Sequence, residues 1–154
     1  MQHEITTRHP LLDEQGRLIE AGYTKGLLMD YDRKAIKGGA LRIKEWDYYL
    51  INNGRFALAL TVDDNGYMGL DSISLLNFEE GWEITTSPMC FMPLGKRKLP
   101  ETSAVGDTLG EGKNYSIYFK NDGSGVRTLI AQMKKFGPAG SLYAKVELFD
   151  EPEE

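Results

Sequence analysis

The sequence predicts an all-β protein in which an antiparallel meander closes into a lipocalin-like barrel. The chain has 154 residues and 17 glycines, well above the usual share of about 7%, so turns are frequent. At least seven short strand-like runs are separated by Asn, Asp and Gly residues that favour tight turns. Several runs also alternate apolar and polar residues with a period of two, as half-buried strands do.

The length fits one domain, which we expect to span residues 1–154. Residues 1–22 form an N-terminal arm and turn, 23–149 the barrel strands, and 150–154 an acidic tail. A chain of this size buries about 68–70% of its unfolded surface, so its core needs no disulfide or metal.

The residues that favour turns predict where the strands of the N-terminal half begin and end. One short helical turn is expected at 32–37, with Asp32 as its N-cap and glycines after it. Asn53-Gly54 separates two strand-like runs and predicts a type I′ hairpin, because both residues tolerate positive φ. With further turns at 64–66 and 80–81, residues 42–90 should form four sequential antiparallel strands.

The C-terminal half continues the pattern, with turns expected at 121–125 and 137–140. The segment 93–112 is rich in Pro and Gly and is expected to be a long loop carrying at most a short strand. Seven or more strands must close on themselves or stack as two sheets, and a meander closes most easily into an up-and-down barrel. The alternation predicts a buried set of Phe56, Leu58, Leu60, Val62, Leu142, Val146 and Leu148.

Charge and composition exclude several classes of partner. The net charge is −5, and the densest basic cluster, 96–98, sits in a proline-bounded stretch typical of a solvated loop, so neither nucleic acid nor an anionic membrane is expected. No signal peptide and no membrane span are expected. The single Cys90 between Met89 and Phe91 resembles a small buried hydrophobe, so a reducing, cytoplasmic location is expected.

The run Lys44–Tyr49 is the most unusual local sequence. On a strand, Glu45 and Asp47 share one face, and Trp46 and Tyr48 share the other. Two strand steps of ~3.3 Å place the two carboxylates about 6.5–7 Å apart, which suits an acid/base pair. The alternative is a polar face paired with Arg or Lys across the sheet.

Aromatic residues make up 10% of the chain. Some lie near polar residues on strands, as they do around a ligand cleft with one apolar and one polar side, although core packing is the alternative for each. The ligand-binding residues that this pattern predicts are Trp46, Tyr48, Tyr49, Tyr67 and Trp82.

No metal site and no cofactor site is expected. The turn 63–66 lacks the ligand spacing of a calcium loop, and an Asx turn explains it. His3 and His9 have no further His or Cys to complete a metal site, so we interpret them as surface residues. The glycine-rich motifs that bind phosphates or dinucleotides are absent.

Five segments of the chain resemble a bacterial family called domain of unknown function 2804. These are residues 11–18, 21–23, 44–49 and 63–69, and the loop from Pro93-Leu94 to Gly106-Asp107. The resemblance covers nearly the whole chain, and the run 44–49 is its most specific part.

That family is distantly similar to two-barrel, lipocalin-like proteins such as carotenoid hydratases and tocopherol cyclases. The resemblance implies that this chain matches an N-terminal half, with residues 149–154 near the junction to a second barrel. It implies no catalytic residue, but it does imply a cavity for a small molecule.

Three functions follow as expectations. The first is binding of a hydrophobic or amphipathic small molecule. The second is a hydratase or cyclase acting on an unsaturated isoprenoid-type substrate, with Glu45 and Asp47 transferring protons. The third is a structural half-domain that pairs with a second barrel or with a second copy, through an exposed patch containing Trp46 and Tyr48.

Overall fold

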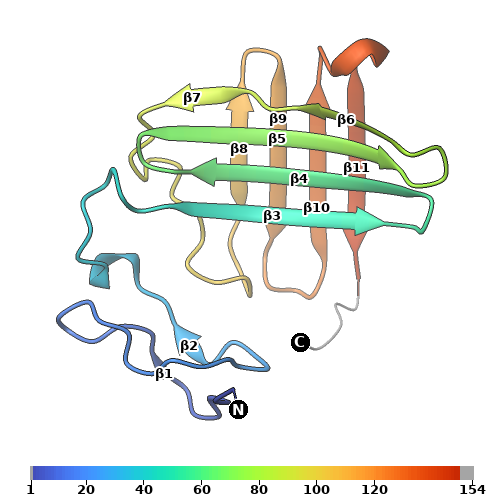
Figure 1. Cartoon of the computed structure of the whole chain (residues 1–154). Helices are drawn as coiled ribbons and strands as arrows, with labels where there is room; N and C mark the ends of the chain where they lie inside the picture. Colours follow the sequence, from blue (N-terminus) through green and yellow to red (C-terminus); the bar gives the residue numbers. More distant parts are fainter. Residues whose placement is uncertain (1, 150–154) are drawn as a thin grey trace.

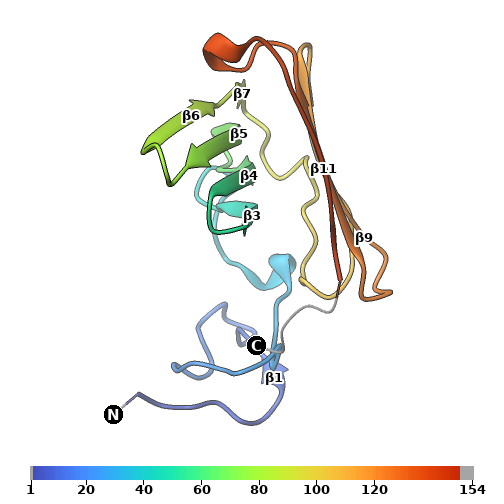
Figure 2. The same cartoon turned by 90° about the vertical axis from the view of Figure 1, so that its right-hand side faces the viewer.

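Two antiparallel sheets lie face to face, with an N-terminal arm below them (Figure 1). The computed structural model describes residues 2–149, apart from the side chain of Ala139. The strands of the two sheets cross each other in Figure 1, and Figure 2 shows the sheets edge-on as two layers. The predicted all-β, antiparallel class is therefore confirmed, whereas the acidic tail expected at 150–154 lies outside the described residues.

The first sheet contains the four sequential antiparallel strands expected over residues 42–90. Its turns fall at the three predicted places. A fifth short strand, separated from the fourth by Ser87 and Pro88, pairs with the beginning of the third. The strands are β3 (Glu45–Asn52), β4 (Phe56–Asp64), β5 (Met68–Asn77), β6 (Trp82–Thr86) and β7 (Met89–Phe91).

The second sheet is formed by the C-terminal strands in the order β11-β10-β9-β8. Its turns lie at 122–126 and 134–141, close to the predicted positions, and the second contains the short 3-10 helix η2 (Gly137–Ala139). The strands are β8 (Thr108–Gly112), β9 (Tyr115–Asn121), β10 (Arg127–Met133) and β11 (Leu142–Leu148).

The N-terminal arm, which in the structure extends over residues 2–44 up to the start of β3, has little regular structure. Two short strands, β1 (His9–Pro10) and β2 (Met29–Asp30), pair in parallel. The helical turn expected at 32–37 is the 3-10 helix η1 (Arg33–Ala35). Its N-cap is Asp32, as predicted, because the Asp32 carboxylate accepts the backbone N–H of Lys34 at 2.8 Å.

The predicted closure into a barrel is wrong: no ladder joins the two sheets within residues 2–149. The reason lies in the connection 92–107, which has no strand and crosses from one sheet to the other. Met92, Leu94 and Lys98 have φ of +52° to +53° there, a conformation that a strand cannot include. The meander therefore breaks after β7, and the two halves stack instead.

The hydrophobic core lies between the sheets, on the predicted strand faces. Leu60 and Val62 are fully buried within it. Leu58 and the three predicted residues of β11 pack against it and are half-buried. Phe56 packs instead beside Trp82, with ring centroids 6.4 Å apart. Ala57, which is outside the predicted buried set, is also buried.

The first hairpin differs from its predicted turn type. Asn53 donates its backbone N–H to the carbonyl of Phe56 at 3.1 Å, so Gly54 and Arg55 are the two central residues. Only Gly54 has a positive φ, of +86°. That pattern is typical of a type II′ turn, because type I′ needs a positive φ at both positions.

Candidate functional site

A cleft of about 1340 Å³ opens between the two sheets beside the edge strand β3. Its walls come from β3, the connection between the sheets, the β9–β10 turn, the end of β11 and residues 25–27 of the arm. Principal side chains of the lining are Asp47, Tyr49, Thr108, Phe119, Arg127 and Leu148.

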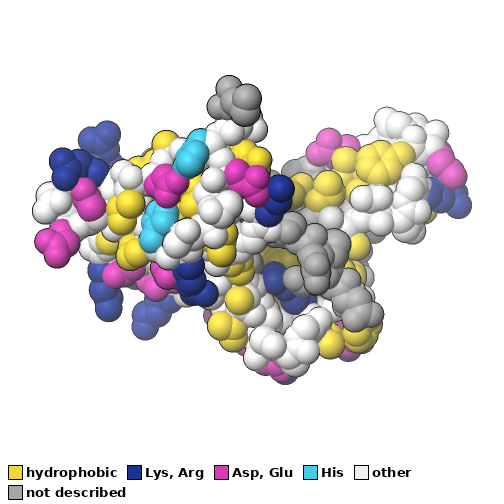
Figure 3. Space-filling view, turned by 90° about the horizontal axis from the view of Figure 1, so that it is seen from below, with side chains coloured by type: hydrophobic (Ala, Val, Ile, Leu, Met, Phe, Trp, Pro, Cys, Tyr) yellow, Lys and Arg dark blue, Asp and Glu magenta, His cyan; other side chains and the backbone are white. Residues whose placement is uncertain are grey.

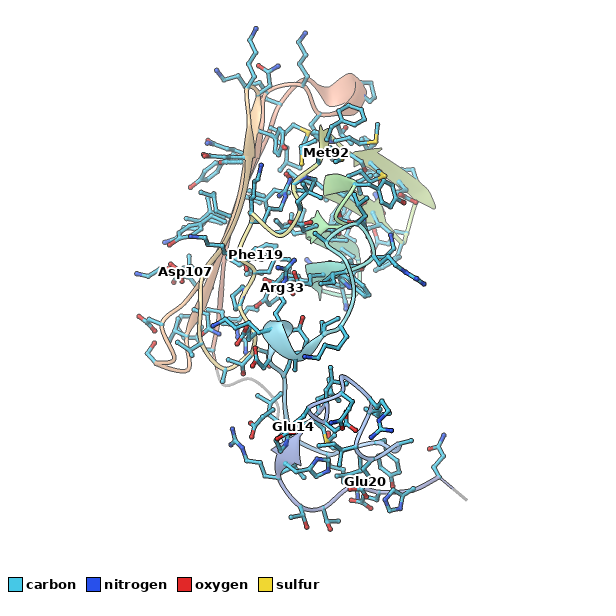
Figure 4. All side chains as sticks on the ribbon, turned by 90° about the vertical axis from the view of Figure 1, so that its left-hand side faces the viewer. Glu14, Glu20, Arg33, Met92, Asp107 and Phe119 are labelled. Atoms are coloured by element: carbon cyan, nitrogen blue, oxygen red, sulfur yellow. The ribbon has the colours of Figure 1, made fainter. Side chains whose placement is uncertain are left out.

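Aromatic rings form the inner wall of this cleft. Tyr49 points inward from β3 and meets Phe119 of β9 edge-to-face, with ring centroids 4.7 Å apart. In Figure 4, Phe119 projects from the second sheet toward the first. Arg127 donates one terminal N–H to the Tyr49 hydroxyl at 2.8 Å and another to the carbonyl of Ser103 at 2.6 Å. The ring and the guanidinium therefore hold each other in place.

Polar groups also line this cleft. The Thr108 hydroxyl donates to the carboxylate of Asp47, which joins β8 to β3 across the gap between the sheets. Asn121, at the end of β9, donates its side-chain amide to the carbonyl of Ser103 at 2.9 Å. Hydroxyl, amide and carboxylate groups thus lie beside the aromatic wall.

A smaller cavity of about 320 Å³ adjoins the cleft and shares Trp46, Asp47 and Pro100 with it. Glu45 lines this cavity, and both its oxygens accept hydrogen bonds, from the Tyr31 hydroxyl at 2.8 Å and from Arg33 at 2.7 Å. Burial, together with the hydrogen bond to Glu45, raises the pKa of Tyr31 to about 12. Tyr31 therefore stays protonated and acts as a donor to Glu45.

The structure separates the predicted site residues into two groups. Asp47 and Glu45 face inward, as the alternation requires, and Tyr49 lies on the same face. Trp46 and Tyr48 lie at the rim of the cleft but are exposed on the outer face of the sheet.

Tyr67 and Trp82 lie outside the cleft lining. Tyr67 is stacked under the ammonium group of Lys44, at 4.6 Å from the ring centroid. Trp82 lies beside Phe56 and donates its indole N–H to Glu80 at 2.7 Å.

Sequence reasoning missed Thr108, Phe119 and Arg127. Phe119 shares the inward phase of its strand with Ile117, so the alternation of β9 alone marks it as buried. No local sequence pattern identifies Arg127 or Thr108 as site residues, because each belongs to the site only through a contact between the two sheets.

A second polar cluster anchors the connection that lines the cleft. Arg97 binds the buried carboxylate of Asp71 and also contacts the sulfur of Cys90 at 3.1 Å. Burial acts to lower the pKa of Arg97, but these hydrogen bonds outweigh it and raise that pKa. Asp64 accepts the backbone N–H of Gly95 at 2.8 Å. These contacts position the connection, including its cleft-lining residues near Pro100.

No helix within residues 2–149 is both long enough and apolar enough to traverse a bilayer. In the same part of the chain, no group of three or more His, Cys, Asp or Glu side chains is arranged to hold a metal ion.

Neither the curated proteins nor the solved structures give a match for this chain. The family model described as domain of unknown function (DUF2804) matches residues 2–154, nearly the entire sequence. The predicted resemblance is thereby confirmed, and the chain belongs to the DUF2804 family.

Proposed function

We propose that this chain binds a hydrophobic or amphipathic small molecule in the cleft beside β3. The observation that carries the proposal is a cleft of about 1340 Å³ between the sheets, lined by aromatic rings and a few polar groups. Ligand sites usually measure about 300–1,000 Å³ and combine an apolar lining with a few placed polar groups. This cleft is larger than that range, so it has room for a large ligand.

The lining favours an elongated ligand with one polar end. Tyr49, Phe119 and Leu148 offer apolar surface. Asp47, on the same face of β3 as Tyr49, offers a carboxylate beside it, and the buried Thr108 hydroxyl donates to that carboxylate. A molecule that is apolar along its length and polar at one end would pair with both.

Thermal unfolding in the presence of fatty acids, isoprenoid alcohols and small polar metabolites tests the proposal. A ligand present at 100 times its dissociation constant should stabilise the fold by about 2.7 kcal/mol. Ala104 lines the cleft, so Ala104→Trp should obstruct part of it and weaken the shift. Ala40 is exposed and lies outside the lining, so Ala40→Trp is the matched control and should keep the shift.

Two outcomes would contradict the proposal. One is the absence of a shift with every apolar or amphipathic compound of the panel. The other is a shift that Ala104→Trp leaves unchanged, since binding would then occur away from this part of the chain.

A hydratase or cyclase is a second proposal, supported by the position of one carboxylate. Asp47 faces inward and lines both the cleft and the smaller cavity, so it is the better of the two acid candidates. Glu45 already accepts hydrogen bonds on both oxygens. Hydration adds the proton and hydroxyl of one water across a double bond, which an acid/base group beside the substrate promotes.

Mass spectrometry of unsaturated isoprenoids incubated with the chain tests this second proposal. A hydratase gives a product heavier by one water, and a cyclase gives an isomer of unchanged mass with a different retention time. Asp47→Asn should abolish either product while ligand stabilisation persists. If turnover survives that substitution, Asp47 is not the acid.

A further inference from the structure

The outer face of the first sheet is unusually apolar for a surface with nothing packed on it. In Figure 1 this face is turned toward the viewer, and in Figure 2 it forms the free side of the layer that contains β3 to β7. Trp46, Tyr48 and Leu50 point outward from β3, and Met89 and Phe91 from β7. Their exposed fractions run from 52% to 82%.

The outer face of the second sheet provides an internal comparison. Four charged side chains lie on it, and they are Glu111, Lys120, Lys145 and Glu147. That composition is typical of a solvated sheet face. On the strands of the first sheet, only Asp63 and Glu83 are charged among the outward-facing residues. The first sheet therefore has apolar residues on both faces, as strands covered on both sides do.

The apolar face has a self-complementary shape. Small residues form a low floor on the two central strands, where Ala59 pairs with Ser74 and Thr61 pairs with Ser72. The large side chains of β3 form a ridge along one edge of this floor, and the small Thr85 of β6 lies along the other. Met89 and Phe91 of β7 lie beyond the end of the floor, beside Leu70 and Met68 of β5. A second copy turned by a two-fold rotation could place its β3 ridge over this floor and receive the first copy's ridge in return.

The area of the face suits an interface between two copies. The strands β3, β4 and β5 have 8, 9 and 10 residues, and β6 and β7 follow each other along a fourth row. Four rows about 4.8 Å apart, about nine residues long at ~3.4 Å per residue, cover about 19 by 30 Å. Two such faces would bury roughly 1,100 Å² in total, which reaches the ~1,000 Å² that a specific interface needs. Because the face carries so few charges, pairing it with itself brings no cluster of like charges together.

We propose that two copies of this chain associate through the outer faces of their first sheets, related by a two-fold axis, with the β3 ridge of each copy over the small-residue floor of the other. The occupant of the face is thus a second copy, and Tyr48 and Phe91 lie inside the contact. Tyr143 lies on the opposite side of the molecule, on the outer face of β11, and is 69% exposed.

Light scattering after size-exclusion chromatography, over a concentration series up to the high micromolar range, measures the association. The wild type should form a dimer. Tyr48→Glu and Phe91→Glu should each weaken dimerisation by about tenfold or more, equivalent to about 1.4 kcal/mol, because each buries a charge without a partner. Tyr143→Glu makes the same chemical change on the other sheet and should leave the dimer intact.

All three substituted side chains are exposed on strands, and thermal unfolding verifies that each variant is folded. A wild type that stays monomeric at high micromolar concentration overturns the proposal, and the face then belongs to a different partner. A dimer that resists both Tyr48→Glu and Phe91→Glu, or one that Tyr143→Glu weakens equally, also overturns it.

Discussion

The guanidinium of Arg97 binds the carboxylate of Asp71 through both terminal nitrogens, at 2.6 and 2.9 Å. Asp71 is fully buried on β5, and its second oxygen also accepts the Tyr115 hydroxyl from β9 at 2.7 Å. Burial, followed by this hydrogen bond, raises the pKa of Tyr115. One carboxylate thereby joins the first sheet, the connection and the second sheet.

Arg97→Met should lower the free energy of unfolding by about 3–5 kcal/mol, because it leaves the buried Asp71 carboxylate without its cation. Urea denaturation measures the loss. Arg55→Met is the matched control: Arg55 pairs with Glu79 at 2.8 Å, but both side chains are more than half exposed. An exposed pair contributes about 0–1 kcal/mol, so equal losses from the two variants would refute the structural role of Arg97.

Gly110→Ala should destabilise the fold by about 1–3 kcal/mol, as overpacking does. A Cβ at Gly110 would lie 2.8 Å from one oxygen of Asp71, against a carboxylate already fixed by Arg97. Gly39→Ala is the control, since its Cβ would meet nothing within 4 Å and its φ is not positive. Chemical denaturation of both variants measures the difference, and a neutral Gly110→Ala would show that the carboxylate can shift.

Local sequence was sufficient to predict the elements of each sheet. Asn53-Gly54, Asp64–Gly66 and Glu80-Gly81 lie at turns of the first sheet, because glycine and Asx residues stabilise turns through their own backbone and side chains. The alternation from 56 to 62 placed Leu60 and Val62 on the buried face for the same local reason.

The arrangement of the sheets could not be predicted in this way. Closure depends on whether β7 and β8 belong to one ladder, and the connection that separates them is fixed by distant partners. Asp71 holds Arg97, 26 residues away, and Asp64 holds the backbone of Gly95, 31 residues away. The cleft follows from the same contacts, so only its β3 side was predictable.

Leu60→Ala should lower the free energy of unfolding by about 2–5 kcal/mol, because it leaves a cavity in the closed core. Sequence alone predicts the same loss for Leu58→Ala, but Leu58 is only half-buried, so its loss should fall at the low end of that range. Urea denaturation of both variants gives the two values. A larger loss for Leu58 than for Leu60 would place the centre of the core nearer to the β3–β4 turn.

The N-terminal arm should be most stable at mildly acidic pH. Glu20 contacts both His3 and His9, and Figure 3 shows the two histidines among acidic side chains. A hydrogen bond to the Pro10 carbonyl and the contact with Glu20 raise the pKa of His9 above 6.5, so its contribution fades as pH rises through that higher value. The contact with His3 lowers the pKa of Glu20 below 4.5, so that contribution fades as pH falls through the lower value.

Hydrogen exchange of the Ile5 backbone amide measures this stability, because that amide donates to the Tyr23 carbonyl at 2.9 Å. After correction for the pH dependence of the intrinsic exchange rate, its protection should peak between about pH 4.5 and 6.5. Glu20→Gln should flatten this profile, and a profile unchanged by that substitution would rule out the histidine contacts as its cause.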